Sequence, residues 1–202
     1  MLKKALSGVS AGVMIAIGGS VYLACDNRYI GAVLFSVALL TICFKGYSLY
    51  TGRIGFIPEK HDRETVAALF LGLVGNLAAT IVCGFLIRLS VPSLGAAAES
   101  LCAGKLVQNG LQTLIRGAFC GVLMYVAVSV YRDGKNITGI LFGIPVFILS
   151  GFEHSIADMF YFAAGGMLSG RVFLFILTVI LGNSLGAVLL PLLSGRGGKE
   201  KA

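Results

Sequence analysis

The stretch Gly151-Phe-Glu-His-Ser-Ile-Ala-Asp-Met-Phe160 places Glu153, His154 and Asp158 inside a long apolar segment, about 137–167, that is long enough to cross a bilayer. Ionisable groups at membrane depth are costly, so they normally face a protein interior or a wet cavity and mark a permeation or proton path. Glycines on both sides favour an interrupted helix, and non-helical backbone is tolerated at this depth only where it lines a cavity or is buried in protein. The stretch therefore predicts a membrane-embedded site on a broken helix.

The composition indicates a polytopic membrane protein. Of 202 residues, 57% are hydrophobic and only 12% are charged, whereas soluble domains average about 25% charged residues. The formal net charge is +7. We interpret the excess lysines and arginines as residues that flank the membrane spans and set their orientation, and we expect no nucleic acid partner. The five cysteines are isolated and form no CxxC pair, so we expect no metal site, no disulfide framework and no cofactor.

At about 20 apolar residues per crossing, the chain predicts an all-α membrane protein with six transmembrane spans. The second and fifth spans are too long for one straight crossing and are broken by polar residues, at 46–53 and 150–155. The spans run approximately over 5–25, 31–57, 64–88, 109–131, 137–167 and 171–193.

The two halves of the chain, 1–95 and 104–195, follow the same order of features. Each contains a plain span, a broken span and a span with a Gly-Asn pair, at Gly75-Asn76 and Gly182-Asn183. Three spans per half invert the second half relative to the first, which predicts a 3+3 inverted repeat with a binding site near the midplane. We expect a single channel domain over 1–202. The excess of Lys and Arg in the loops on one side predicts a multi-pass protein of the cell (inner) membrane with both termini cytoplasmic.

On these motifs the chain resembles the formate/nitrite transporter family, the pentameric channels for small monovalent anions with an aquaporin-like fold. The resemblance covers essentially the whole chain, as a short variant expected to lack the usual amino-terminal amphipathic helix. The residues that carry it are the stretch 151–160, Leu49-Tyr-Thr-Gly52, Gly75-Asn76, Arg116-Gly-Ala-Phe-Cys120 and Gly182-Asn183.

The resemblance implies a role for each of several substrate-pore residues. His154 matches the central pore histidine, and Thr51 matches the threonine of the second span's break that approaches this histidine. Phe35 and Phe147 match aromatic residues that narrow the pore, and Leu39 matches an apolar constriction.

Three further pore residues follow from the resemblance. Lys105 matches a vestibule lysine that attracts anions, Glu153 matches the glutamate before the histidine, and Tyr50 replaces the commoner phenylalanine. From the residues alone, Glu153 is expected to hydrogen-bond backbone freed by the break, and Thr51 either contacts the pore or caps a half-helix.

Other positions depart from the family pattern. Gly121 stands where a pore-facing asparagine is usual, and Asp158 replaces the usual asparagine. Lys45, just before the first break, either pairs with Asp158 or extends along the helix towards water. These departures bear on which anion is carried.

The function expected is a channel or transporter for small monovalent anions of weak acids, with formate, nitrite, hydrosulfide, acetate and lactate all open. Lys105, Arg116 and Lys45 would concentrate anions by electrostatic focusing, and His154 would aid passage by supplying a proton, unless water does. Protons, the lipid bilayer and four further copies in a homopentamer are the expected partners, and no enzyme activity is expected. The alternative is an aquaporin-like channel for small neutral solutes, although paired Asn-Pro-Ala motifs are absent.

Overall fold

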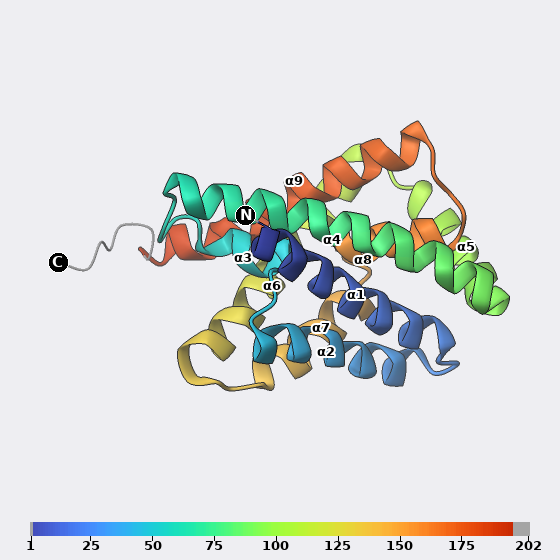
Figure 1. Cartoon of the computed structure of the whole chain (residues 1–202), viewed down its shortest axis with the longest axis horizontal. Helices are drawn as coiled ribbons and strands as arrows, with labels where there is room; N and C mark the ends of the chain where they lie inside the picture. Colours follow the sequence, from blue (N-terminus) through green and yellow to red (C-terminus); the bar gives the residue numbers. More distant parts are fainter. Residues whose placement is uncertain (1, 196–202) are drawn as a thin grey trace.

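The computed structural model describes residues 2–195, and within this range every regular element is a helix (Figure 1). The elements in chain order are α1 (Leu2–Ala24), α2 (Arg28–Lys45), α3 (Tyr50–Arg53), η1 (Ile54–Phe56), α4 (Arg63–Ser90), α5 (Pro92–Leu106), α6 (Gly110–Gly134), α7 (Thr138–Leu149), α8 (Ser155–Ala164) and α9 (Gly170–Leu193).

Five of these helices, α1, α2, α4, α6 and α9, are long and apolar enough to cross a membrane, and α7 is a shorter apolar helix. Large apolar side chains remain exposed along them, such as Phe70 on α4 and Leu174 on α9. Extensive exposed apolar surface marks contact with a membrane or another protein. In Figure 1, α1 begins and α9 ends towards the same side of the molecule.

Polar caps define where several of the long helices begin. The side chains of Asn27, Asp62 and Ser169 accept hydrogen bonds from backbone N–H groups in the first turns of α2, α4 and α9. Asn109 and Gln112 form a reciprocal capping box at the start of α6. Such caps satisfy N–H groups that have no partner within the helix, so the helix boundaries follow from local residue choice.

The helical path is interrupted at two places. Helix α2 ends at Gly46, which has a left-handed φ of 68°, and α3 begins only at Tyr50. Helix α7 is followed by Gly151, with a φ of 70°, before α8 begins at Ser155. Glycine adopts this conformation without the steric cost that a Cβ atom carries. Each interruption leaves backbone polar groups that need partners outside the helix.

Asn76 on α4 supplies these partners at the first interruption. Its Oδ1 accepts a hydrogen bond from the backbone N–H of Tyr50 at 2.8 Å. Its Nδ2 donates to the carbonyl of Ser48 at 2.9 Å and to the carbonyl of Gly8 on α1 at 2.8 Å. One buried side chain thus joins α4 and α1 to the start of α3.

Asn183 on α9 makes the same set of contacts at the second interruption. Its Oδ1 accepts from the backbone N–H of Ser155 at 3.0 Å. Its Nδ2 donates to the carbonyl of Glu153 at 2.8 Å and to the carbonyl of Gly117 on α6 at 2.9 Å. The two Gly-Asn pairs therefore hold the two interruptions in equivalent ways.

Glycines let the helices on either side of each asparagine approach closely. A Cβ atom on Gly12 of α1 would lie 2.6 Å from the carbonyl oxygen of Asn76. On Gly121 of α6 it would lie 2.1 Å from the carbonyl oxygen of Asn183. The interpretation of Gly121 as a pore-facing position is therefore wrong, because this residue packs against the backbone of α9.

Replacing Gly121 by alanine should destabilise the protein by about 1–3 kcal/mol, as overpacking does in a tightly packed interior. The methyl group would push α9 and Asn183 away from α6. The control is Gly134→Ala on the same helix, where an added Cβ meets nothing within 4 Å. Thermal unfolding of the detergent-solubilised variants measures the difference, and equal melting temperatures would contradict this account of the packing.

Candidate functional site

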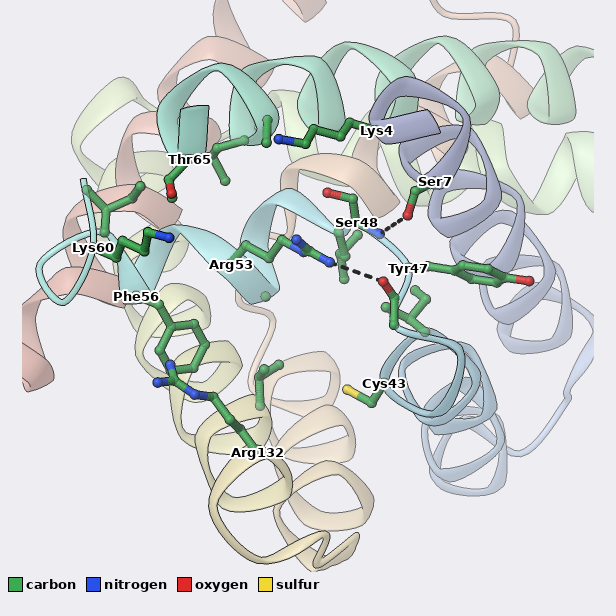
Figure 2. Close-up of a pocket in the computed structure, with 18 of the residues that line it drawn as sticks. Lys4, Ser7, Cys43, Tyr47, Ser48, Arg53, Phe56, Lys60, Thr65 and Arg132 are labelled. Atoms are coloured by element: carbon green, nitrogen blue, oxygen red, sulfur yellow. Dashed lines mark hydrogen bonds between the residues drawn. The ribbon is translucent and has the colours of Figure 1, made fainter. Parts of the chain in front are cut away.

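Two cavities adjoin the interruptions, one lined by residues of the second interruption and the other by residues of the first. The first, which we name the Lys105 cavity, has a volume of about 240 Å³ and is lined in part by Arg28, Lys105, Arg116 and Tyr161. The second, the Arg53 cavity, has a volume of about 810 Å³ and is lined in part by Arg53 (Figure 2). A narrow wall of side chains lies between them.

This wall, which we call the neck, contains Phe35, Leu39, Thr51, Phe147 and His154. Phe35, Phe147 and His154 line the Lys105 cavity, whereas Leu39 lines the Arg53 cavity. Phe35 and Leu39 are one turn apart on α2, so the neck is about 6 Å thick along this helix. The Phe35 and Phe147 rings meet edge to face with centroids 6.3 Å apart. The structure thus brings together all five residues.

His154 lies at the second interruption, immediately before α8. Its Nδ1 accepts a hydrogen bond from the backbone N–H of Ala157 at 3.2 Å, so the side chain caps the helix. Nδ1 therefore presents its lone pair, and in the neutral ring the proton is on Nε2. Nε2 lies 2.8 Å from Oγ1 of Thr51. The imidazole also stacks on Phe147, with centroids 5.7 Å apart and planes at 22°.

Thr51 reaches His154 from the other interruption, 103 residues earlier in the chain. The residue preceding α3 is Leu49, which makes no side-chain cap, so Thr51 does not cap this helix. Both Thr51 and His154 are almost completely buried. The pair therefore links the two interruptions, and the capping alternative for Thr51 is wrong.

Lys105 on α5 forms a buried ionic cluster with two carboxylates. Its Nζ contacts Oε2 of Glu153 and lies 2.9 Å from Oδ1 of Asp158. Gln108 donates a hydrogen bond to Oε1 of Glu153 at 2.6 Å. Oδ2 of Asp158 is buried without a hydrogen-bond partner among the residues that the structure describes. Lys105 is therefore not an isolated cation at the cavity wall.

The expectation for Glu153 is wrong, and so is the first of the two alternatives for Lys45. The Glu153 carboxylate bonds to Lys105 and Gln108, and Asn183 satisfies the freed backbone instead. Lys45 does not pair with Asp158, because Lys105 holds that carboxylate while Lys45 is exposed at the end of α2.

Tyr50 lines neither cavity in the described structure; its hydroxyl lies 2.8 Å from Oγ of Ser184 on α9. Lys45 likewise lines neither cavity, whereas Arg116 lines the Lys105 cavity. Tyr50 thus stands beside the predicted site rather than in it. Its place is set by α9 through Ser184 and by Asn76, which binds its backbone N–H.

Arg53 is a cavity residue that sequence reasoning missed. It is the last residue of α3, and its guanidinium donates a hydrogen bond to the Gly46 carbonyl at 3.1 Å across the interruption (Figure 2). The signal available in the sequence was a charged residue inside the polar break 46–53. Within residues 2–195, no group of three or more His, Cys, Asp or Glu side chains could hold a metal ion.

Several known proteins are similar to this chain in sequence. The family model described as Formate/nitrite transporter matches residues 1–194. The uncharacterized transporter YwcJ of Bacillus subtilis (strain 168) is 26% identical over 186 residues, which cover 80% of this chain and 73% of YwcJ. The formate channel FocB of Escherichia coli (strain K12) is 26% identical over 179 residues, 77% of this chain but only 64% of FocB. The chain thus spans just under two thirds of FocB.

Two solved structures have the same fold. One described as an FNT family ion channel superposes with a TM-score of 0.85 at 22% identity, covering 98% of this chain and 91% of that one. A pentameric formate channel with formate bound superposes with a TM-score of 0.78 at 23% identity and covers 96% of each chain. Because the family model extends over nearly all of the chain, the protein belongs to the formate/nitrite transporter family and is an integral membrane protein of this transporter class.

Proposed function

We propose that the protein is a transmembrane channel or transporter for small monovalent anions of weak acids, of the formate, nitrite and hydrosulfide class. The observation that carries the proposal is the buried His154–Thr51 pair in a thin apolar neck between two cavities lined by cationic side chains. Membership of the family and the named formate channels among its relatives support the same substrate class.

The architecture we propose is a single channel domain with six transmembrane spans, arranged as a 3+3 inverted repeat, aquaporin-like. The second span comprises α2, α3 and η1, and the fifth comprises α7 and α8. Matching packing supports this: α1 packs on α4 as α6 packs on α9, and η1 contacts α9 as α8 contacts α4. The equivalent contacts of Asn76 and Asn183 also support it.

We place both termini in the cytoplasm, with the protein in the cell (inner) membrane. Lys3 and Lys4 line the Arg53 cavity, so in this orientation that cavity opens to the cytoplasm and the Lys105 cavity opens to the outside. The abundance of Lys and Arg on the Arg53 side agrees with the positive-inside rule.

The proposed route avoids moving a bare charge through the neck. A charge at the bilayer centre costs several kcal/mol by any estimate, about 2.5 kcal/mol or more, and the neck offers no charged partner. The substrate would therefore pass Phe35, Phe147 and Leu39 largely as its neutral acid. Neutral His154 would present Nε2–H as a polar contact. His154 would supply a proton only as the imidazolium, whose Nδ1–H displaces the N–H of Ala157 and which is left neutral by the transfer; water is the other proton source.

Charge at the mouth of the Lys105 cavity depends on more than Lys105. Glu153 and Asp158 together exceed the charge of Lys105 when both are ionised, and one of them alone balances it. Arg28 and Arg116 also line the cavity, and neither forms an ion pair within the described structure. We propose that these arginines supply most of the anion focusing at this mouth, while Lys105 holds the carboxylates in place.

Stopped-flow flux in proteoliposomes, with a panel of weak acids at two pH values, tests the proposed function. Formate, nitrite and hydrosulfide should enter at protein-dependent rates, and glycerol should not. Glycerol flux without anion flux would instead favour the neutral-solute alternative and overturn the proposal.

Replacing His154 by asparagine should change the pH profile of weak-acid flux, because the neck then contains no titratable side chain. Asparagine is a favourable helix cap, so the start of α8 should persist. His61→Asn is the matched control, because His61 is the only other histidine and is exposed in a loop. An unchanged pH profile in His154→Asn would mean that His154 has a purely structural role.

Replacing Lys105 by methionine should destabilise the protein by about 3 kcal/mol, because two buried carboxylates lose their cation. Adding Asp158→Asn should restore part of the lost stability, because it removes one buried carboxylate that has no cation. Lys60→Met is the control, since the Lys60–Asp62 pair is exposed and such pairs contribute at most about 1 kcal/mol. Thermal unfolding of Lys105→Met, Asp158→Asn, the double variant and Lys60→Met measures the coupling, and strictly additive effects would contradict the cluster.

The protein should form a homopentamer with a separate pore in each protomer. The solved pentameric formate channel with the same fold motivates this expectation, and the exposed apolar faces of the long helices provide surface for contacts between protomers. Mass measurement in detergent and chemical crosslinking determine the stoichiometry. A monomer, or a dimer with one shared pore, would contradict it.

A further inference from the structure

Arg53 lines the Arg53 cavity close in the chain to the neck. It follows Thr51 by two residues on the one-turn helix α3, and Thr51 contacts His154 directly. Gly52 and Leu39 also line this cavity, so the cavity reaches the neck where α3 begins. Figure 2 shows the Arg53 guanidinium directed into the space that the cavity occupies.

Arg53 has no carboxylate partner among residues 2–195, although Glu59 and Glu64 line the same cavity. Three other basic side chains that line this cavity are each bound to an acid. These ion pairs are Lys4–Glu64 at 2.7 Å, Lys60–Asp62 at 3.4 Å and Arg132–Glu59 at 2.6 Å. The Arg53 guanidinium instead donates one hydrogen bond to a neutral acceptor, the Gly46 carbonyl. A guanidinium has five N–H donors, so its charge and most of its donors remain available to a ligand.

The geometry of the ligand follows from the chemistry of the guanidinium. Its planar fork binds two oxygens of one anion through parallel charge-assisted hydrogen bonds, which a lysine ammonium does not reproduce. Carboxylates and nitrite present two such oxygens, whereas hydrosulfide presents a single sulfur. We propose that Arg53 binds planar two-oxygen anions at the neck end of the Arg53 cavity and thereby favours carboxylates and nitrite over hydrosulfide.

The surroundings suit a binding site that releases its ligand readily. The cavity, at about 810 Å³, is far larger than a small anion, so the bound anion keeps part of its hydration shell. Conduction requires binding that is strong enough for the ion to be taken up but weak enough for it to leave. Because one donor suffices for the Gly46 carbonyl, the anion is bound while Arg53 keeps its hydrogen bond across the interruption before α3.

The test compares Arg53→Lys with Arg132→Lys, which changes an arginine of the same cavity whose fork is engaged by Glu59 and by the ring of Phe56. Both substitutions keep the charge. Flux of formate and of hydrosulfide is measured in proteoliposomes in both directions. Arg53→Lys should raise the KM for formate about tenfold, the effect of losing one charge-assisted hydrogen bond, with hydrosulfide changed less than twofold. Arg132→Lys should change neither.

Equal slowing of formate and hydrosulfide by Arg53→Lys would overturn the inference, because Arg53 would then only hold the interruption at Gly46 in place. No change in either flux would also overturn it, because Arg53 would then have no part in transport. If Arg53→Lys does not assemble as wild type does, Arg53→Gln takes its place, with the same preferential loss for formate expected.

The inference rests on the proposed function for its substrate class, so a second measurement is independent of transport. Binding of ¹³C-formate to the detergent-solubilised protein is followed by NMR, with wild type, Arg53→Lys and Arg132→Lys compared. Weak binding that is lost only in Arg53→Lys supports the site even if wild type transports no formate. Wild-type flux of formate with binding unaffected by Arg53→Lys would leave the proposed function intact and overturn the inference.

Discussion

The structure depends on two buried asparagine side chains that replace helical hydrogen bonds where the chain leaves the helix. In the low-polarity interior of a membrane protein each unsatisfied backbone group costs several kcal/mol, so a broken helix persists only where other groups supply its partners. Asn76 and Asn183 each provide one acceptor and two donated bonds to backbone atoms. Thr51 and His154 can meet at the centre only because both interruptions are held in this way.

The asparagines can reach their partners because glycines, which have no side chain, let the neighbouring helices approach closely. No hydrophobic driving force acts between helices in lipid, so close packing of backbones is what holds them together. Gly12 and Gly121 allow α1 to approach α4 and α6 to approach α9 at the level of Asn76 and Asn183. Tight helix pairs and broken helices are therefore parts of one arrangement, in which packing places the polar side chains that the interruptions need.

Charges are kept out of the neck and placed on either side of it. The neck consists of three apolar side chains and the His154–Thr51 pair, whose hydrogen bonds are those of a neutral imidazole. Lys105 with its two carboxylates lies on one side, and Arg53 lies on the other. This separation suits a weak acid, whose anion is attracted to the cavities while its neutral form crosses the neck at much lower cost.

The sequence alone was sufficient to predict the all-helical membrane class and the family, because these depend on local patterns and motifs. The residues of the neck followed from the family resemblance. Apolar length, glycine breaks and ionisable residues within an apolar segment each act over one span. The contacts of Lys105, Gly121 and Arg53 could not be predicted in this way. Lys105 meets Glu153 48 residues away, Gly121 faces the backbone of α9 rather than a pore, and Arg53 extends into a cavity formed by several helices. Which way a side chain points relative to a distant helix is decided by how the helices pack, and the periodicity of a single span carries no information about that packing.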